Sequence, residues 1–272
     1  MACQVLYHYC SLKAFLGIVQ SREIRLTNIF SMNDSAEHYW LRRVARRLAR
    51  QTGENKNLRS LASKLFPKDE ATELYCCCFS EMDDSLAQWR AYADDGRGVA
   101  IGFDRGFLGS LYKKYRGLFL RTVVYDPKKQ EEIVEEIITQ TRNDHDPPPA
   151  GLPGELTEDL PATVAKVSLW LYAAWCKNPA FHEERESRLV YNPKVDQSTA
   201  IGQRRYRSTR GKIVPYYALP LTADDGVTVI REIMFGPKNA HKHNEAVARR
   251  LLSDKGYYAS RISFRVSEAT YT

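Results

Sequence analysis

The chain lacks any run of about 18 apolar residues, so the sequence predicts no membrane-spanning helix. Its start lacks a basic segment followed by a long apolar one, and we expect no secretory signal. No CxxC pair occurs among the six cysteines, which argues against a structural zinc site. The run Cys76-Cys77-Cys78 lies in an apolar stretch and predicts a buried strand of reduced thiols. Together these features indicate a cytoplasmic protein.

Two common nucleotide-binding signatures are also missing. The sequence has no GxxxxGK[ST] phosphate-binding loop, and Gly96-Arg97-Gly98 lacks the third glycine of a dinucleotide-binding turn. The sequence therefore argues against a P-loop and against a Rossmann site.

The composition and the order of the predicted elements indicate the fold class. The 272 residues are 43% hydrophobic, which is ample for the core of one large domain spanning 1–272. Predicted strands are scattered between predicted helices without regular alternation, which favours an α+β fold. The strands are expected at 4–9, 24–26, 74–80, 99–103, 118–125, 187–191, 205–220, 229–235 and 258–264. The helices are expected after Ser11 and at 35–50, 56–66, 85–92, 127–141, 162–176 and 239–254. Residues 143–161, rich in proline, acid and glycine, predict an inserted surface loop.

Basic residues gather in two places. The net charge is +7, and a positive net charge favours a polyanionic partner. Arginines between Arg42 and Arg50 recur at spacings of three and four, which places them on one helix face. A second group, from Arg204 to Lys212, is interleaved with Tyr206 and followed by two more tyrosines. Each cluster fits either a solvated surface or a nucleic-acid contact surface.

A charged string, Glu183-Glu184-Arg185-Glu186-Ser187-Arg188, runs directly into Leu189-Val190-Tyr191. Residues 187–191 have the composition of a strand, so Glu184, Glu186 and Arg188 are expected on one side of it. Two carboxylates and a guanidinium on one face are costly to bury. The string fits either a solvated edge strand with an internal ion pair or a functional site.

Three other groups of residues could supply the rest of such a site. They are Tyr7-His8-Tyr9 with Ser11, the polar run Ser31 to Glu37 that includes Asn33, and Gln88-Trp89 with Tyr92. Each also has a structural interpretation, as half-buried aromatic residues, a helix cap or helix packing. Together with the acidic string they are the residue types that bind a dinucleotide: aromatic rings for stacking, hydrogen-bonding side chains for ribose and an arginine for pyrophosphate. A glutamate could stabilise an oxocarbenium-like transition state.

The whole chain resembles a bacterial domain-of-unknown-function family, number 2971. Six motifs carry the resemblance, and they stand in the family's order. They are Leu6-Tyr7-His8-Tyr9; Ser31 to Asp34 with Glu37; Cys78-Phe79-Ser80 with Asp84, Trp89 and Tyr92; Gly98 to Phe103; Glu184, Glu186 and Arg188; and Ile230 to Pro237.

The same opening and late glutamate look like the ADP-ribosyltransferase fold, which implies a split β-sheet core with flanking helices. By that resemblance the protein is an NAD-dependent ADP-ribosyltransferase, with Glu186 catalytic and Glu184 orienting the acceptor. The expected NAD-binding residues are Tyr7, His8, Tyr9, Ser11, Asn33, Trp89, Tyr92 and Arg188. The hypothesis requires the first strand and the acidic strand to converge on one pocket.

The acceptor stays open between nucleic acid and protein, and the resemblance implies a bacterial toxin or anti-phage defence effector, with a neutralising antitoxin as a further partner. The main alternative is a non-catalytic nucleic-acid-binding or regulatory module, in which the acidic string is a structural ion pair. A third is a metal-dependent nuclease or hydrolase that uses Asp34, Glu37, Glu184 and Glu186. For the favoured transferase, no metal is expected.

Overall fold

The computed structural model describes residues 4–32, 40–51, 74–143, 168, 171–195, 201–209, 211–221 and 229–271. The chain divides into two compact units. Unit 1 comprises Met1–Ser31, Glu73–Thr122 and Glu183–Thr272, and unit 2 comprises Met32–Thr72 and Val123–His182. The predicted helix at 56–66 and nearly all of the predicted loop at 143–161 lie outside the described residues.

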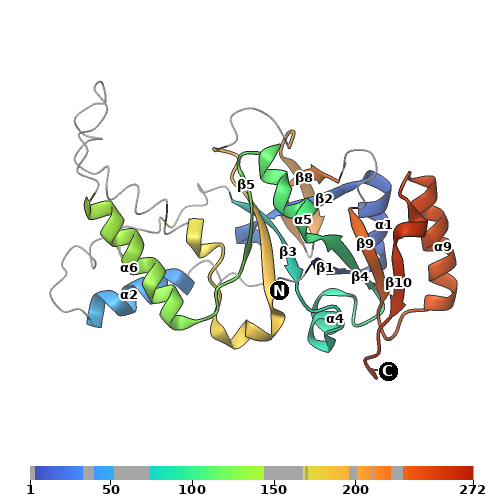
Figure 1. The fold of residues 1–272 in the computed structure, drawn as a ribbon, viewed down its shortest axis with the longest axis horizontal. Helices are drawn as coiled ribbons and strands as arrows, with labels where there is room; N and C mark the ends of the chain where they lie inside the picture. Colours follow the sequence, from blue (N-terminus) through green and yellow to red (C-terminus); the bar gives the residue numbers. More distant parts are fainter. Residues whose placement is uncertain are drawn as a thin grey trace. The chain divides into compact units, whose positions relative to one another are not determined.

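Unit 1 is built on a ten-stranded, mostly antiparallel sheet (Figure 1). The order of its main path is β10-β9-β4-β1-β3-β2-β8-β7, and β6 joins β3 to β5 beside that path. Only β9 and β10 run parallel among the described strand pairs. The strands are β1 Val5–Cys10, β2 Glu23–Asn28, β3 Tyr75–Ser80, β4 Val99–Asp104, β5 Leu118–Thr122, β6 Glu186–Tyr191, β7 Arg205–Thr209, β8 Lys212–Pro220, β9 Ile230–Phe235 and β10 Ser263–Val266. The α+β prediction is confirmed at this level.

The helices of unit 1 begin at capped positions or at tight turns. Ser11 precedes α1 and its Oγ accepts a hydrogen bond from the Ala14 N–H at 3.3 Å, as an N-cap does. Asp104 caps α5 in the same way through the Phe107 N–H, a short helix that the sequence did not predict. The helices are α1 Leu12–Ser21, α4 Leu86–Tyr92, α5 Arg105–Ser110 and α9 His241–Asp254. Short 3-10 turns are η1 Ile29–Ser31, η3 Leu111–Lys113, η4 Pro179–Glu184 and η5 Ala259–Arg261.

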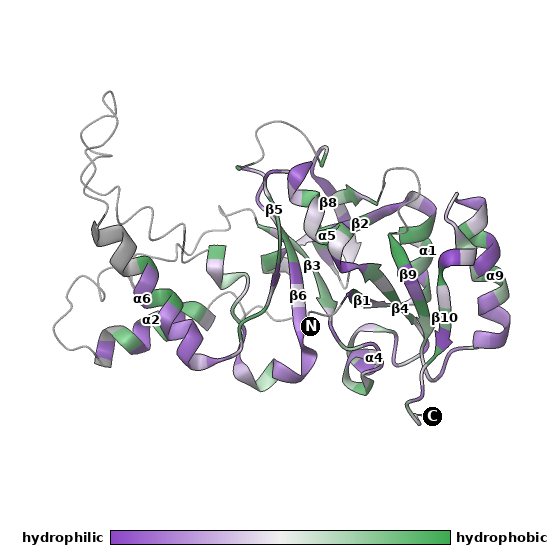
Figure 2. Cartoon of the chain, viewed as in Figure 1, coloured by the Kyte–Doolittle hydropathy of each residue, from purple (hydrophilic) through white to green (hydrophobic). Residues whose placement is uncertain are grey.

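The two faces of the sheet carry separate apolar clusters, as the two-residue period of a strand requires. The larger cluster joins alternate strand residues such as Leu6 and Ile101 to Phe15 of α1, Leu108 of α5 and Leu252 of α9. The smaller cluster is on the other face, where α4 supplies the ring that is packed against β1. Its buried members are Tyr7, Tyr9, Trp89, Ala93, Ala100 and Met234. Figure 2 shows the contrast between the hydrophobic strand β9 and the mainly hydrophilic helix α9.

Unit 2 contains α2 (Trp40–Gln51) packed on α6 (Pro127–Asn143). The indole of Trp40 donates to the Gln130 side chain at 2.9 Å, and Gln130 in turn donates to the backbone oxygens of Val124 and Lys177. Helix α2 buries Leu41, Val44, Ala45 and Leu48. Its arginines supply the predicted basic helix face. One of them, Arg47, forms an ion pair with Glu131. No helix in the described part of the chain is long and apolar enough to span a membrane.

Candidate functional site

The sheet of unit 1 forks at β3. One edge of β3 pairs with β6 along its whole length, from Tyr75 to Ser80. The other edge is divided: its beginning pairs with β2 at Cys76, and its end pairs with β1 at Ser80. Strands β1 and β2 therefore part from one another along the middle of β3, and Cys78 faces the opening between them.

His8 of β1 lies at the point where β1 and β2 separate. Its Nδ1 lies 3.0 Å from the backbone oxygen of Cys78. A carbonyl can only accept a hydrogen bond, so Nδ1 carries the proton and Nε2 holds a lone pair when the ring is neutral. Burial lowers the pKa of His8, and the Cys78 hydrogen bond opposes that shift only in part. The ring is thus held neutral, with a hydrogen-bond acceptor at Nε2.

The thiol of Cys77 also lies 3.7 Å from Nδ1 of His8. This contact is not a nucleophile–base pair, because burial raises the pKa of Cys77 well above its ordinary value and neighbouring Cys76 adds to the shift. The nitrogen nearest the sulfur is also the protonated one. The five described cysteines are free, as the sequence predicted.

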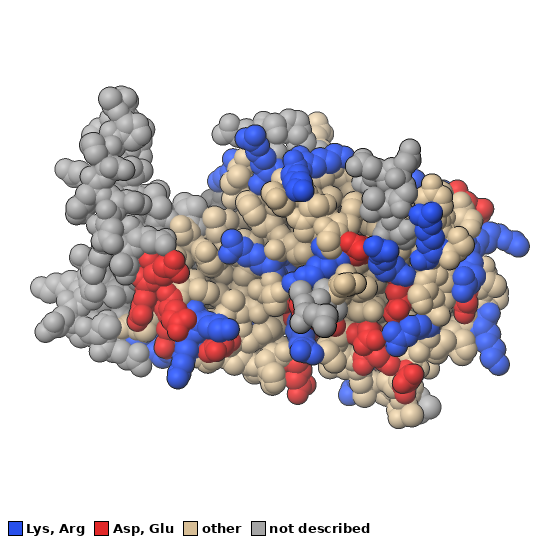
Figure 3. All heavy atoms as spheres, viewed as in Figure 1, with Lys and Arg blue, Asp and Glu red and all other residues tan. Residues whose placement is uncertain are grey.

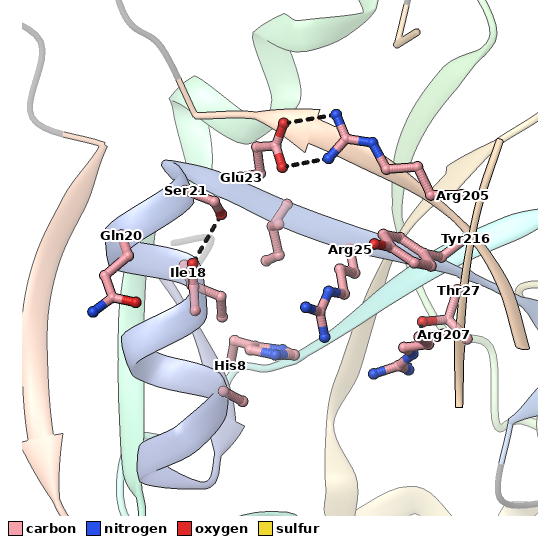
Figure 4. Close-up of a pocket in the computed structure, with 13 residues that line it drawn as sticks. His8, Ile18, Gln20, Ser21, Glu23, Arg25, Thr27, Arg205, Arg207 and Tyr216 are labelled. Carbon is pink, nitrogen blue, oxygen red and sulfur yellow. Dashed lines mark hydrogen bonds and ion pairs between the residues drawn. The ribbon is translucent and has the colours of Figure 1, made fainter. Parts of the chain in front are cut away.

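A pocket of about 580 Å³ opens where β1 and β2 part. It is lined by His8, by one side of α1 and by residues of β2, β7 and β8. Figure 4 shows His8, Arg25 and Arg207 pointing from three strands into the same space beside α1. Two segments that are far apart in sequence, 8–27 and 205–216, therefore form one concave site of a size that is typical for small ligands.

The pocket has an excess of positive charge. Neither Arg25 nor Arg207 has a carboxylate within ion-pair distance in the described part of the chain. The guanidinium of Arg25 lies over the ring of Tyr216, 5.3 Å from its centroid. Arg207 donates to the Thr27 hydroxyl at 3.2 Å, while its buried Nε has no hydrogen-bond partner among the described residues. Burial lowers the pKa of Arg207, and the charge of Arg25 lowers it further.

The carboxylate that does line the pocket is already neutralised. Glu23 accepts two hydrogen bonds from Arg205, at 2.9 and 3.2 Å, and this bidentate pair closes one rim of the pocket (Figure 4). Since Glu23 cancels the charge of Arg205, the charges of Arg25 and Arg207 remain uncompensated within the lining. Such a site favours an anion with several oxygens.

The acidic string lies elsewhere. Glu186 is opposite Ser80, and Ser80 is opposite Tyr7, so Glu186 shares the face of Tyr7. His8 points to the other face, where its ring contacts Phe79. The structure therefore does not bring His8 and Glu186 into one pocket, because a strand sends successive side chains to opposite faces. The expected convergence of the first strand and the acidic strand on one pocket is corrected by this register.

Glu186 and Arg188 form a buried bidentate ion pair. Arg188 donates from Nε and from one terminal nitrogen to the two oxygens of Glu186, at 2.8 and 2.9 Å. Glu186 is 5% exposed and Arg188 is 3% exposed. The sequence predicted the shared face of Glu186 and Arg188 correctly, whereas Glu184 lies in η4 and not in the strand. The pair is buried, and β6 pairs with β3 on one side and β5 on the other, so β6 is not an edge strand.

Glu184 lies at the end of η4, ahead of the strand. Its carboxylate accepts a hydrogen bond from the Tyr92 hydroxyl at 3.3 Å, and its backbone oxygen accepts one from Ser80 at 2.8 Å. The structure thus brings together Tyr92 and Glu184, two of the predicted site residues, on the side of the sheet that faces away from His8.

The motif around Trp89 has a structural role. Trp89 is fully buried and its indole N–H donates to Asp84 at 2.6 Å. Asp84 also accepts from the Ser267 hydroxyl and from the Glu268 N–H, and these bonds lower its pKa although burial acts to raise it. The Tyr9 hydroxyl accepts from the Ser85 N–H and donates to the Met82 oxygen. Both rings are therefore anchored in the core, where they tie α4 and the C-terminal segment to the sheet.

Of the ten predicted site residues, His8 is in the lining of this pocket. Ser11 is the N-cap of α1, and Asn33 lies outside the described residues. The remaining seven, Tyr7, Tyr9, Trp89, Tyr92, Glu184, Glu186 and Arg188, do not line it. No group of His, Cys, Asp or Glu in the described part of the chain could hold a metal ion. Asp34 and Glu37, which the nuclease alternative requires, are outside that part.

Sequence reasoning missed Arg25 and Thr27, whereas Arg207 and Tyr216 belong to the basic and aromatic group that it identified. Arg25 stands between Ile24 and Leu26 in a short strand, and a charge flanked by buried aliphatic residues signals only that one face is polar. Their meeting with Arg207 depends on the pairing of β2 with β8, which has no local signature.

Residues 88–189 match the model of a family described as "Protein of unknown function (DUF2971)". The match covers the Trp89 motif and the acidic string, and it supports the resemblance to that family. A comparison with curated proteins and one with solved structures each found no match.

Proposed function

We propose that the protein binds a phosphate-bearing nucleotide in the pocket at the fork of the sheet. The observation that carries the proposal is the meeting of Arg25 and Arg207, two guanidinium groups in one pocket without a carboxylate partner there. Like charges in a concave site repel one another, so they are stabilised by an anion that bridges them. Planar guanidinium groups match phosphate oxygens, and a diphosphate supplies enough oxygens for both.

The remaining lining suits a nucleotide better than an inorganic anion. The volume of about 580 Å³ exceeds what one phosphate fills and lies within the range of small-molecule pockets. Nε2 of His8 can accept a hydrogen bond from a ribose hydroxyl. The Tyr216 ring, already paired with Arg25, offers an edge or a face to a base. NAD, the cofactor predicted from sequence, is one ligand with these groups.

The prediction of ADP-ribosyl transfer goes further than this proposal. It assigns the chemistry to Glu186, whose two oxygens are occupied by Arg188 and which faces away from the pocket. The proposal therefore stops at binding, and the catalytic step stays a prediction. Release of nicotinamide from NAD by the wild-type protein tests that step separately. So does its loss in Glu184→Gln, because Glu184 is partly exposed and its carboxylate accepts a hydrogen bond from the Tyr92 hydroxyl.

The binding experiment is calorimetric titration of the full chain with ADP, NAD and pyrophosphate. We expect Arg25→Gln and Arg207→Gln each to raise the Kd for ADP about 10- to 100-fold, the value of one or two charge-assisted hydrogen bonds. Arg249→Gln is the control, because this arginine is exposed on α9 and pairs with Glu245. Unaltered ADP affinity in both pocket variants, or no binding by the wild type at millimolar ADP, overturns the proposal.

A further inference from the structure

The hairpin of β7 and β8 forms one wall of the pocket and then continues beyond it. Strand β7 is the last strand of the sheet and pairs with β8 alone among the described strands. The segment from Arg204 to Ile213 contains several cationic residues and no acidic one. On the face drawn in Figure 3, Lys and Arg side chains gather near the top, over the region that holds β8 in Figure 1.

The hairpin has two different faces. Arg205 and Arg207 lie opposite Tyr216 and Val214, and they reach the pocket. Tyr206 lies opposite Pro215, on the other face of β7. A single edge strand thus alternates between cations that reach the pocket and groups on its outer face.

The outer face exposes an aromatic ring and an aliphatic side chain. Tyr206 is 59% exposed, and Ile213 is 78% exposed. Ser208 lies opposite Ile213 and is also exposed. The guanidinium of Arg204 lies 5.8 Å from the centroid of the Tyr206 ring. A flat ring held beside a cation at the surface contributes little to the core, but it is the arrangement on which a nucleic-acid base stacks.

We infer that the β7–β8 hairpin binds single-stranded nucleic acid and leads one of its nucleotides to the pocket. The inference rests on the proposed function for the destination of that nucleotide, whereas the hairpin itself supplies the contacts to the strand. Lys212 and Arg204 contact backbone phosphates. The exposed Tyr206 ring stacks a base of any identity, so the surface binds without strong sequence preference.

The exposed Tyr206 ring distinguishes single-stranded nucleic acid from other polyanionic partners. An acidic peptide or a duplex backbone would use the positive charges equally well, but neither offers an unpaired base to Tyr206. Base stacking is worth about 5- to 150-fold in affinity per aromatic ring, so the ring gives the prediction that separates the partners.

The test is fluorescence anisotropy of the full chain with a labelled 12-nucleotide oligo-dT and oligo-U across a series of salt concentrations. We expect Tyr206→Ala to weaken binding at least 5-fold. Lys212→Gln is expected to reduce the slope of log K against log salt by about 0.7, the value of one single-strand phosphate contact. The matched control is Tyr258→Ala, since Tyr258 is 52% exposed and also lies beside an arginine, Arg261, at 5.0 Å.

Five outcomes separate this inference from the proposed function. Weakened binding in Tyr206→Ala but not in Tyr258→Ala supports it. Equal affinity of the wild type and Tyr206→Ala for the oligonucleotide overturns it, as does equally strong competition by polyglutamate. If Arg25→Gln abolishes ADP binding while the Tyr206 effect on oligonucleotides persists, both stand. If ADP does not bind the wild type but the Tyr206 effect is present, the pocket proposal fails and the strand-binding surface remains.

Discussion

Unit 1 contains two contrasting pairs of charged side chains: one of opposite charges that pair with each other, and one of like charges that line a pocket. Glu186 and Arg188 form a bidentate ion pair, at 2.8 and 2.9 Å, and both are buried. Arg25 and Arg207 have the same sign, face one pocket and lack a carboxylate partner in the described part of the chain. Folding accounts for the first pair. The second has no such carboxylate, and it is the pair that the proposed anion would bridge.

The largest effect is expected from breaking the buried pair. Glu186→Gln removes the carboxylate that accepts both hydrogen bonds described above from the buried Arg188 guanidinium, and we expect the free energy of unfolding to fall by about 3–5 kcal/mol. Urea denaturation followed by circular dichroism measures it. The sequence-based hypothesis expects the same variant to fold normally, whereas the burial of the pair predicts a loss of stability, so this measurement decides between the two.

The double variant Glu186→Gln with Arg188→Met sharpens the result. The double variant also removes the buried guanidinium that has lost its carboxylate partner, so it should regain part of the stability that Glu186→Gln loses. A single variant as stable as the wild type would show that Arg188 finds another partner or water, and the structural role assigned to the pair would then fail.

A smaller effect is expected at Trp89. Trp89→Phe removes the indole N–H that Asp84 accepts and leaves space beside a smaller ring. We expect a loss of about 1–3 kcal/mol in the free energy of unfolding, with an unchanged Kd for ADP. An ADP affinity that falls tenfold without loss of stability would instead return Trp89 to the ligand site that the sequence suggested.

The pocket arginines should behave in the opposite way. We expect Arg207→Gln to change the free energy of unfolding by no more than about 0.5 kcal/mol, because it also relieves repulsion from Arg25. Thermal unfolding with and without ADP measures both properties. ADP should raise the Tm of the wild type and leave that of the variant nearly unchanged. A large loss of stability in Arg207→Gln without ligand would make this arginine structural, like Arg188.

The positions of helices and strands could be predicted from the sequence more accurately than the pairing between the strands. Alternation in β1, β3 and β4 and the cap at Ser11 are local signals, and the strands and helix that they predict are present. The strand predicted at 258–264 is instead the turn η5 followed by β10 at Ser263–Val266. The shared face of Glu186 and Arg188 also follows from alternation. The fork at β3 does not, because it depends on which strands pair with each end of that strand. Pairing between strands that are distant in sequence determines whether His8 shares a face with a carboxylate or with two arginines. A shift of one residue in the register would move His8 to the opposite face.

The pH dependence of His8 gives the smallest effect and tests whether the pocket lining remains neutral at this position. Burial lowers the pKa of His8 below 6.5, so the unfolded chain binds more protons than the native one as the pH falls through that value. Stability contributed by the neutral ring is therefore present above about 6.5 and declines below it. The groups that face the ring, Arg25, Arg207 and the Cys77 thiol, add no negative charge to oppose this. We expect the Tm to fall less between pH 7.5 and 5.5 in His8→Gln than in the wild type. An equal fall in both proteins would place the titrating group elsewhere.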